Sequence, residues 1–272
     1  MLKITIGQYY HADSFIHKLD ARMKLLCTVI FITVLFLVGN FLGYALAALY
    51  LATVIRISKV PPKFLFRGLR AILFIIIFTA FLNIFFTQGG HVVLEAGFVR
   101  ITELGLLNAS RMAIRLVMLI VGSSILTLTT TPIQLTDAIE FSLKPFKKIG
   151  VPAHEIAMMM TIALRFIPTL IEEMDKIMKA QMARGADFDT GGIIKKARSL
   201  VPLLVPLFIS SFRRADDLAL AMEARCYRGD VGRTRMKQMK MKARDYKALS
   251  VLSIFTALVF LLEYFANIWG VW

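Results

Sequence analysis

The sequence predicts an all-α integral membrane protein with about five transmembrane helices. An insert of amphipathic helices on the cytoplasmic side separates the fourth from the fifth. Three observations predict this fold class. Of 272 residues, 57% are hydrophobic and 19% are charged, whereas a soluble domain is about 45–50% apolar and about 25% charged. Mean hydropathy is +0.68, and the apolar residues form long uncharged runs. Basic residues gather beside these runs, as they do on the cytoplasmic side of membrane proteins.

The net charge of +15 does not indicate a nucleic-acid-binding protein. Most Lys and Arg residues, and most acidic ones, lie between Thr131 and Lys247, so this stretch is mixed in charge. Its aromatic residues do not alternate with the basic ones as a base-stacking platform requires. We therefore expect the lipid bilayer, and no nucleic acid, as the partner of the basic residues.

Residues 1–130 are predicted to form an N-terminal membrane region with four spans. The run from Leu25 to Ile55 would be about 46 Å long as one helix, against a hydrocarbon core of about 30 Å. Basic residues on both sides of it require an even number of crossings, so we expect a hairpin turning at Gly39–Gly43, followed by a basic loop from Arg56 to Arg70. A loop from Thr87 to Asn108 is expected outside. The four expected spans are about 25–38, 42–55, 71–87 and 113–130.

Two arginines do not fit the simple charge rule. Arg111 and Arg115 are expected near the outer end of the fourth span, although basic residues favour the inner side. Their guanidinium groups either extend to the membrane interface or face protein. The sequence does not choose between these roles.

Residues 131–247 have helical periodicity without a clean apolar span. We expect helices at about 133–148, 155–185 and 192–228, half apolar and half charged, along the inner membrane surface. Residues 248–272 form the last expected span. Seven basic residues from Arg233 to Lys247 precede this span and none follows it, which predicts a cytoplasmic N-terminus and insert and an external C-terminus.

The sequence argues against an enzyme. It has no Gly-x-x-x-x-Gly-Lys-Ser/Thr loop for nucleotide phosphates, and its four histidines lack metal-ligand spacing. No acidic residue is expected at mid-depth in a span, because Glu263 lies toward the outer half of the last one; ion-coupled carriers usually keep such groups. We therefore expect no catalytic residue, bound cofactor or metal.

Two short segments share one residue pattern, in which alanine and arginine are followed by a small residue. Ala183-Arg184-Gly185 ends the first long amphipathic helix, and Ala224-Arg225-Cys226 ends the second. A small residue lets a partner backbone approach closely, and Gly185 can adopt the left-handed conformation that closes a helix. Arginine is favoured near a helix C-terminus and pairs well with carboxylates. For one copy an ordinary helix end would be the better explanation, but two copies on equivalent helices favour a docking role.

A third segment precedes the first span, from Leu19 to Leu26. Its polar residues are Asp20, Arg22 and Lys24. Asp20 is expected to cap the first helix, with the basic residues at the membrane interface.

With these three motifs, the chain resembles the transmembrane T component (EcfT type, CbiQ-related) of energy-coupling factor (ECF) transporters. The segment from Gly7 to Leu26 is similar to the opening of the general, vitamin-type T components. Ala163–Leu170 with Gln181–Gly185 is similar to the family's first signature region, and Ala221–Arg225 to the second. Cys226 stands where the family usually has glycine.

The resemblance implies that Arg184 and Arg225 end two coupling helices, each of which docks on one of two ABC-type ATPase subunits that hold ATP and Mg. It further implies an interchangeable membrane S component that binds a vitamin, and a prokaryotic cell-membrane location. Two alternatives stay open: a dedicated T component for cobalt, nickel or biotin, and an autonomous secondary transporter. The latter would show an internal inverted repeat of broken helices, which the sequence does not display.

Overall fold

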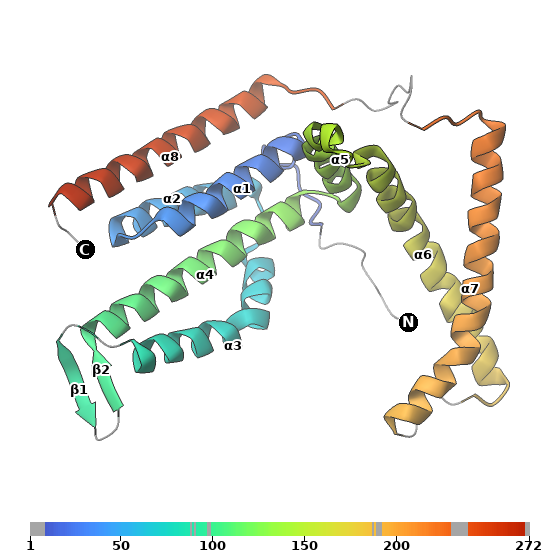
Figure 1. Ribbon diagram of the computed structural model, residues 1–272, viewed down its shortest axis with the longest axis horizontal. Coiled ribbons are helices and arrows are strands. Elements are labelled where there is room, and N and C mark those ends of the chain that lie inside the picture. Colours follow the sequence, from blue (N-terminus) through green and yellow to red (C-terminus); the bar gives the residue numbers. More distant parts are fainter. Residues whose placement is uncertain are drawn as a thin grey trace. The chain divides into compact units, whose positions relative to one another are not determined.

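The computed structural model describes residues 9–87, 89, 91–96, 99–186, 188, 192–229 and 239–269 (Figure 1). Gly7, Gln8 and the basic residues Arg233, Arg235 and Lys237 lie outside this part of the chain. The chain divides into two compact units. Unit 1 comprises Met1–Ala138 and Met239–Trp272, and unit 2 comprises Ile139–Gln238.

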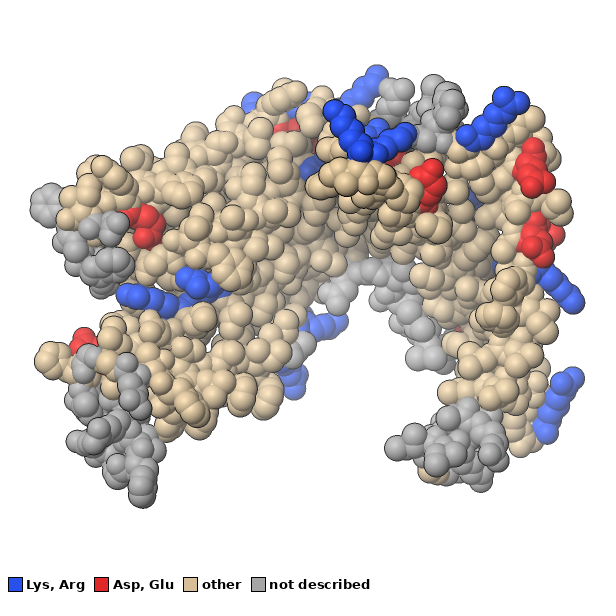
Figure 2. Space-filling model, in the orientation of Figure 1, with Lys and Arg blue, Asp and Glu red and all other residues tan. Residues whose placement is uncertain are grey.

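Unit 1 is a bundle of apolar helices with one short β-hairpin. Its elements are α1 (Ala21–Leu37), α2 (Phe41–Ser58), α3 (Pro62–Phe86), β1 (Val92–Ala96), β2 (Val99–Thr102), α4 (Glu103–Thr129) and α8 (Ala243–Trp269). Helix α4 packs against α1, α2 and α3, and α8 packs against α1 and α2. Figure 2 shows that uncharged side chains cover most of the visible face of these helices, with a few charged ones among them, as is expected of a surface that faces lipid.

The core of unit 1 lies between α1, α2, α4 and α8. It includes Leu35, Tyr44, Leu128 and Leu252, each at most 2% exposed. Gly122 of α4 allows α1 to approach closely, because a Cβ atom there would lie 2.8 Å from the Phe31 ring. Small residues at helix contacts are typical of membrane bundles, whose packing relies on close backbone approach.

The break between α1 and α2 falls at residues 38–40, at the start of the predicted Gly39–Gly43 turn. The basic segment after α2 differs more from the prediction. It is not a loop: Lys63, Arg67 and Arg70 belong to α3, which starts with Pro at the first helical position and bends by 58° between Pro62–Arg70 and Ile72–Phe86. Proline is well tolerated at that position, since its missing N–H has no partner there in any case.

The predicted outer loop from Thr87 to Asn108 is also partly wrong. It contains the antiparallel strands β1 and β2, in which Glu95 pairs with Arg100. Helix α4 then begins at Glu103 rather than near residue 113, capped by the Thr102 hydroxyl, which accepts a hydrogen bond from the Gly105 N–H. This earlier start places Arg111 and Arg115 inside α4.

Unit 2 holds the long amphipathic helices. Helix α5 (Pro132–Leu143) begins in unit 1 and ends in unit 2, followed by the 3-10 helix η1 (Lys144–Ile149), α6 (Ala153–Ala183) and α7 (Ile193–Ala224). Pro168, Pro202 and Pro206 lie inside these helices. Helices α6 and α7 pack against each other and cross (Figure 1), and charged side chains follow α7 (Figure 2).

Four described helices are long and apolar enough to cross a membrane: α2, α4, α6 and α8 to Ala266. The two arms of α3 make a fifth if they form one span. Helix α1, with 17 residues, is about 26 Å long and is shorter than these. The predicted class, a helical membrane protein with about five transmembrane helices, is confirmed, with the β-hairpin as an addition.

Candidate functional site

The first arginine motif closes α6 with a Schellman turn. The Gly185 N–H donates to the Met182 carbonyl at 2.9 Å, and the Ala186 N–H donates to the Gln181 carbonyl at 3.0 Å. Gly185 is left-handed, with φ +87°, as this turn requires. Arg184 is therefore the last residue before the chain reverses, and its side chain extends from the helix end.

The second arginine motif closes α7 in the same way. The Cys226 N–H donates to the Glu223 carbonyl at 2.8 Å, and the Tyr227 N–H donates to the Met222 carbonyl at 3.0 Å. Cys226 has φ 53°, so it adopts the left-handed conformation that glycine adopts at the end of α6. A residue other than glycine pays about 1–2 kcal/mol for this conformation. The departure from the family pattern at this position therefore leaves the turn unchanged.

Both helix ends present an exposed cation. Ala183, Arg184 and Gly185 are exposed, and so are Ala224, Arg225 and Cys226. Neither guanidinium has a hydrogen bond or ion pair within the part of the chain that the structure describes. The helix dipole favours a cation at this position, and a free planar guanidinium can form a bidentate pair with a carboxylate, through two parallel hydrogen bonds.

An ion pair joins α6 to α7 within unit 2. Arg214 Nη2 of α7 donates to Glu173 Oε2 of α6 at 2.6 Å. The carboxylate of Glu173 also neighbours Ser210 of α7, which donates to it. The pair links the two helices where they pack, between the ends that carry the arginines.

The end of α7 contacts the start of α6. The Tyr227 hydroxyl, next to Cys226, lies 3.4 Å from His154 Nε2, and His154 Nδ1 lies 3.3 Å from Glu140 Oε1. The His154 and Glu140 side chains are 12% and 8% exposed. The second arginine motif is thus anchored within unit 2 through its own tyrosine.

The N-terminal motif forms a network in unit 1. Lys24 is 6% exposed, and its Nζ donates to the Thr129 carbonyl at 2.8 Å and to the His17 carbonyl at 3.2 Å. The Tyr10 N–H donates to the Leu128 carbonyl at 2.9 Å. The final carbonyls of α4, which have no partner within their own helix, are therefore satisfied by residues near the N-terminus.

Asp20 and Arg22 extend this network to α8. As predicted, Asp20 caps α1, accepting from the Arg22 N–H at 3.1 Å. Its own N–H donates to Asp245 Oδ1 at 2.9 Å, and Arg22 Nη2 lies 3.4 Å from the Met239 carbonyl. The sequence did not indicate that Asp245 and Met239 bond to this motif, because both are more than 200 residues away from it. The motif thus holds the end of α4, which leads toward unit 2, and the segment that returns from unit 2 into α8.

Arg115 has a structural role at the opposite end of unit 1. Its Nη2 donates to the Val38 carbonyl at 2.9 Å and its Nε donates to the Tyr44 hydroxyl at 3.0 Å. The guanidinium also lies over the Phe36 ring, 5.9 Å from its centroid. Val38 lies in the break between α1 and α2, where its carbonyl lacks a helical partner. Arg115 therefore faces protein, and Arg111 lies over Phe41 at 5.4 Å.

Glu263 of α8 holds the other side of the same break. Its Oε1 accepts from the Gly39 N–H at 2.8 Å and the Asn40 N–H at 3.2 Å, and its Oε2 accepts from Asn40 Nδ2 at 3.1 Å. A carboxylate is favoured at a helix N-terminus. Sequence reasoning placed Glu263 in the outer half of the last span but did not find this role.

Apolar helices whose few charged side chains bond to backbone groups where other helices begin or end, together with two long helices that each end at an exposed arginine, define a multi-pass membrane protein. The CbiQ family model, described as cobalt transport protein, matches residues 12–238. The chain belongs to this family and, with its curated relatives, to the EcfT transmembrane components of energy-coupling factor transporters.

Three relatives illustrate this membership, each named energy-coupling factor transporter transmembrane protein EcfT. The protein of Thermosediminibacter oceani is 58% identical over 248 residues, which cover 91% of this chain and 93% of the relative. That of Clostridium kluyveri is 58% identical over 246 residues, covering 90% and 91%. That of Bacillus subtilis is 45% identical over 263 residues, covering 97% and 99%.

Proposed function

We propose that the chain is the non-catalytic coupling subunit of an ECF-type ABC importer for vitamins or other micronutrients. In this role it transmits ATP-driven motion from two ATPase subunits, which hold the ATP and Mg, to a membrane S component that binds the substrate. The observation that carries the proposal is the pair of matching helix ends, each with an exposed, unpaired arginine in the same turn. Family membership supports the transporter role.

Each coupling helix end docks in a groove of one ATPase subunit, where its arginine pairs with acidic groups. Helix-in-groove recognition depends on a few anchoring side chains, and the Schellman turns present Arg184 and Arg225 as such anchors. The Glu173–Arg214 pair supports joint movement of α6 and α7. The exposed apolar residues of these helices, among them Met159, Leu204 and Phe208, suit contact with the S component.

The test is co-purification with the two ATPase subunits. Arg184→Glu and Arg225→Glu should each weaken capture and the double variant should abolish it, because losing one desolvated charge pair costs about 2–5 kcal/mol. Arg213→Glu is the matched control, since Arg213 is an exposed arginine in the middle of α7. Full capture and normal uptake by the double variant would contradict the docking role.

The orientation forms part of the proposal: the N-terminus and coupling region are cytoplasmic and the C-terminus is external. The basic residues that precede α8 support it. A C-terminal tag should be labelled on intact cells, whereas a tag at the N-terminus should be protected. The reverse pattern would overturn this topology.

A dedicated T component for cobalt, nickel or biotin is the second candidate. The description of the matching family as a cobalt transport protein favours it, whereas the N-terminal segment favours the general type. Capture of several different S components by one preparation would support the general type. Capture of a single S component would support the dedicated one.

A further inference from the structure

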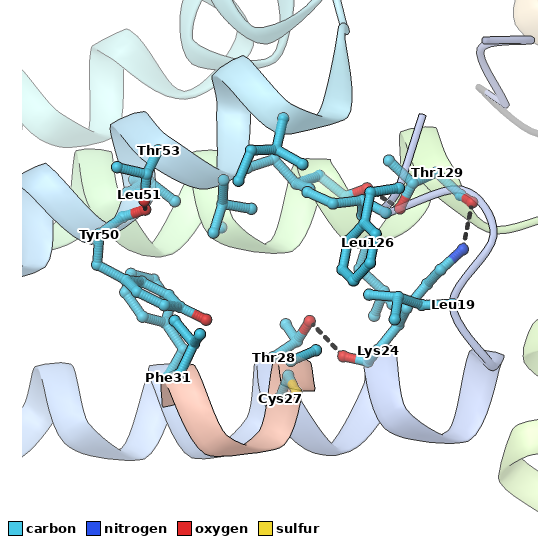
Figure 3. Close-up of a pocket in the computed structure, with 18 of the residues that line it drawn as sticks. Leu19, Lys24, Cys27, Thr28, Phe31, Tyr50, Leu51, Thr53, Leu126 and Thr129 are labelled. Atoms are coloured by element: carbon cyan, nitrogen blue, oxygen red, sulfur yellow. Dashed lines mark hydrogen bonds between the residues drawn. The ribbon is translucent and has the colours of Figure 1, made fainter. Parts of the chain in front are cut away.

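Unit 1 contains a cavity of about 240 Å³ (Figure 3). Its walls come from the segment before α1 and from α1, α2, α4 and α8. Figure 3 shows Phe31 and Tyr50 at one end and Leu19 and Lys24 at the other. The cavity is therefore elongated along α1, with aromatic rings closing one end and a cation at the other.

The walls of this cavity are apolar in effect. Its threonine hydroxyls all bond to carbonyls of their own helices: Thr28 to Lys24 at 2.8 Å, Thr53 to Tyr50 at 2.6 Å, and Thr129 to Ile125 at 2.7 Å. Apart from the Tyr50 hydroxyl and the Cys27 thiol, the walls leave little hydrogen-bonding capacity for water, and a water molecule needs two to four polar partners. A hydrocarbon segment suits these walls better than solvent does.

The end with Lys24 is open and basic. Among the residues that line the cavity, Phe15, Ile57 and Val251 are 41%, 49% and 57% exposed, so the cavity is open to the outside of unit 1. Lys247, also on the lining, is exposed. Lys24 donates to two carbonyls, and its ammonium group has a third hydrogen.

Two carboxylates lie near this end, Asp20 and Asp245. Both already accept hydrogen bonds from backbone N–H groups: Asp20 from Arg22, and Asp245 from Asp20 and Lys242. The basic side chains near the opening, Lys24, Arg244 and Lys247, therefore outnumber the acidic ones, and positive charge remains for a ligand.

We propose that this cavity binds part of one acyl chain of an anionic phospholipid, with the phosphate at the opening beside Lys247 and Lys24. The apolar walls and aromatic end select a hydrocarbon chain, and the basic opening selects an anionic headgroup. Basic pockets between membrane helices are known to take such headgroups on the cytoplasmic side. The cavity is lined by none of the residues at the two arginine-bearing helix ends. The lipid-binding proposal is therefore tested independently of the proposed coupling role.

Native mass spectrometry of the purified chain in detergent tests this proposal. Dioleoyl phosphatidylglycerol should form a one-to-one adduct more tightly than dioleoyl phosphatidylcholine, which carries the same chains. Lys247→Gln should weaken the phosphatidylglycerol adduct about fivefold, the factor expected for one lysine near an anionic lipid surface. Lys63→Gln, an exposed lysine of α3 that does not line the cavity, is the control and should have no effect.

The acyl-chain part of the site is tested with Val54→Trp, which fills the cavity from α2. Leu49→Trp is its control, since Leu49 is on the same helix, 65% exposed and outside the cavity. Val54→Trp should abolish the adduct and Leu49→Trp should preserve it. Equal adducts with both lipids, an adduct unchanged by Val54→Trp, or retention of detergent only would overturn the proposal. Because Lys247 is exposed, its variant gives a result even if the tryptophan variant does not fold.

Discussion

Lys24 Nζ of α1 donates a hydrogen bond to the Thr129 carbonyl of α4 at 2.8 Å. The first helix thus places a buried cation at the C-terminal end of the fourth, where the helix dipole and the unpaired carbonyls favour it. The same segment, through Asp20 and Arg22, holds the start of α8. The N-terminal motif therefore ties together the two parts of unit 1 through which the chain leaves for unit 2 and returns from it.

Lys24→Met should destabilise the membrane unit. The change leaves the Thr129 and His17 carbonyls without their donor, and a buried polar group without a partner costs about 1–3 kcal/mol. Thermal unfolding in detergent measures this loss. Lys18→Met is the control, because Lys18 is exposed and its pair with Asp13 at 3.2 Å lies at the surface, where such pairs contribute little. Equal effects of the two substitutions would contradict the capping role.

Much of the fold is predictable because helix-forming apolar runs and the local cap at Asp20 depend on residues close in sequence. The bond from Lys24 to Thr129 joins residues 105 positions apart, so no local pattern signals it. The same holds for Glu263, whose partners Gly39 and Asn40 lie in the break between α1 and α2, 224 and 223 positions away in the sequence. The arginine motifs were found because they repeat, whereas the hairpin of β1 and β2 was missed because its two short strands lie within a loop of mixed composition.

Cys226→Gly should stabilise the end of α7. Cys226 has φ 53°, and replacing a left-handed residue by glycine removes about 1–2 kcal/mol of backbone strain. The matched variant is Gly185→Cys, which introduces the same strain at φ +87° in α6 and should lower stability by a similar amount. Hydrogen exchange at the amides of Cys226 and Tyr227 measures the local change. Faster exchange in Cys226→Gly would contradict the equivalence of the two helix ends.

Arg115→Leu should destabilise the break between α1 and α2, whereas Arg111→Leu should have little effect. Arg115 donates to the Val38 carbonyl and to the Tyr44 hydroxyl, and losing hydrogen bonds from a charged donor costs about 1.5–3 kcal/mol. Arg111 makes only a cation–π contact, with Phe41, in the described part of the chain. The two arginines lie four residues apart on one helix. The difference between the melting temperatures of the two variants therefore measures the contribution of the Arg115 hydrogen bonds. Equal decreases in melting temperature for the two variants would show that a positive charge in this part of α4, rather than the hydrogen bonds of Arg115, contributes to stability.

His17 should make stability depend on pH. Its Nε2 donates to the Tyr10 carbonyl at 2.9 Å, so in the neutral ring Nδ1 accepts from the Ser14 hydroxyl at 2.7 Å. Burial, the largest influence, lowers the pKa of His17 below its ordinary value of 6.5, and the Lys24 and His11 charges act in the same direction. The bond to Tyr10 and the charge of Asp13 oppose this shift.

Because the unfolded chain binds the proton more readily, the contribution of His17 to stability is fully present above pH 6.5 and is lost as the pH falls below that value. We expect a lower melting temperature at pH 5 than at pH 7.5 in the wild type and a smaller difference in His17→Gln, whose amide can still donate to Tyr10. His91→Gln, in an exposed position, should keep the wild-type dependence. An unchanged pH dependence in His17→Gln would show that another group governs it.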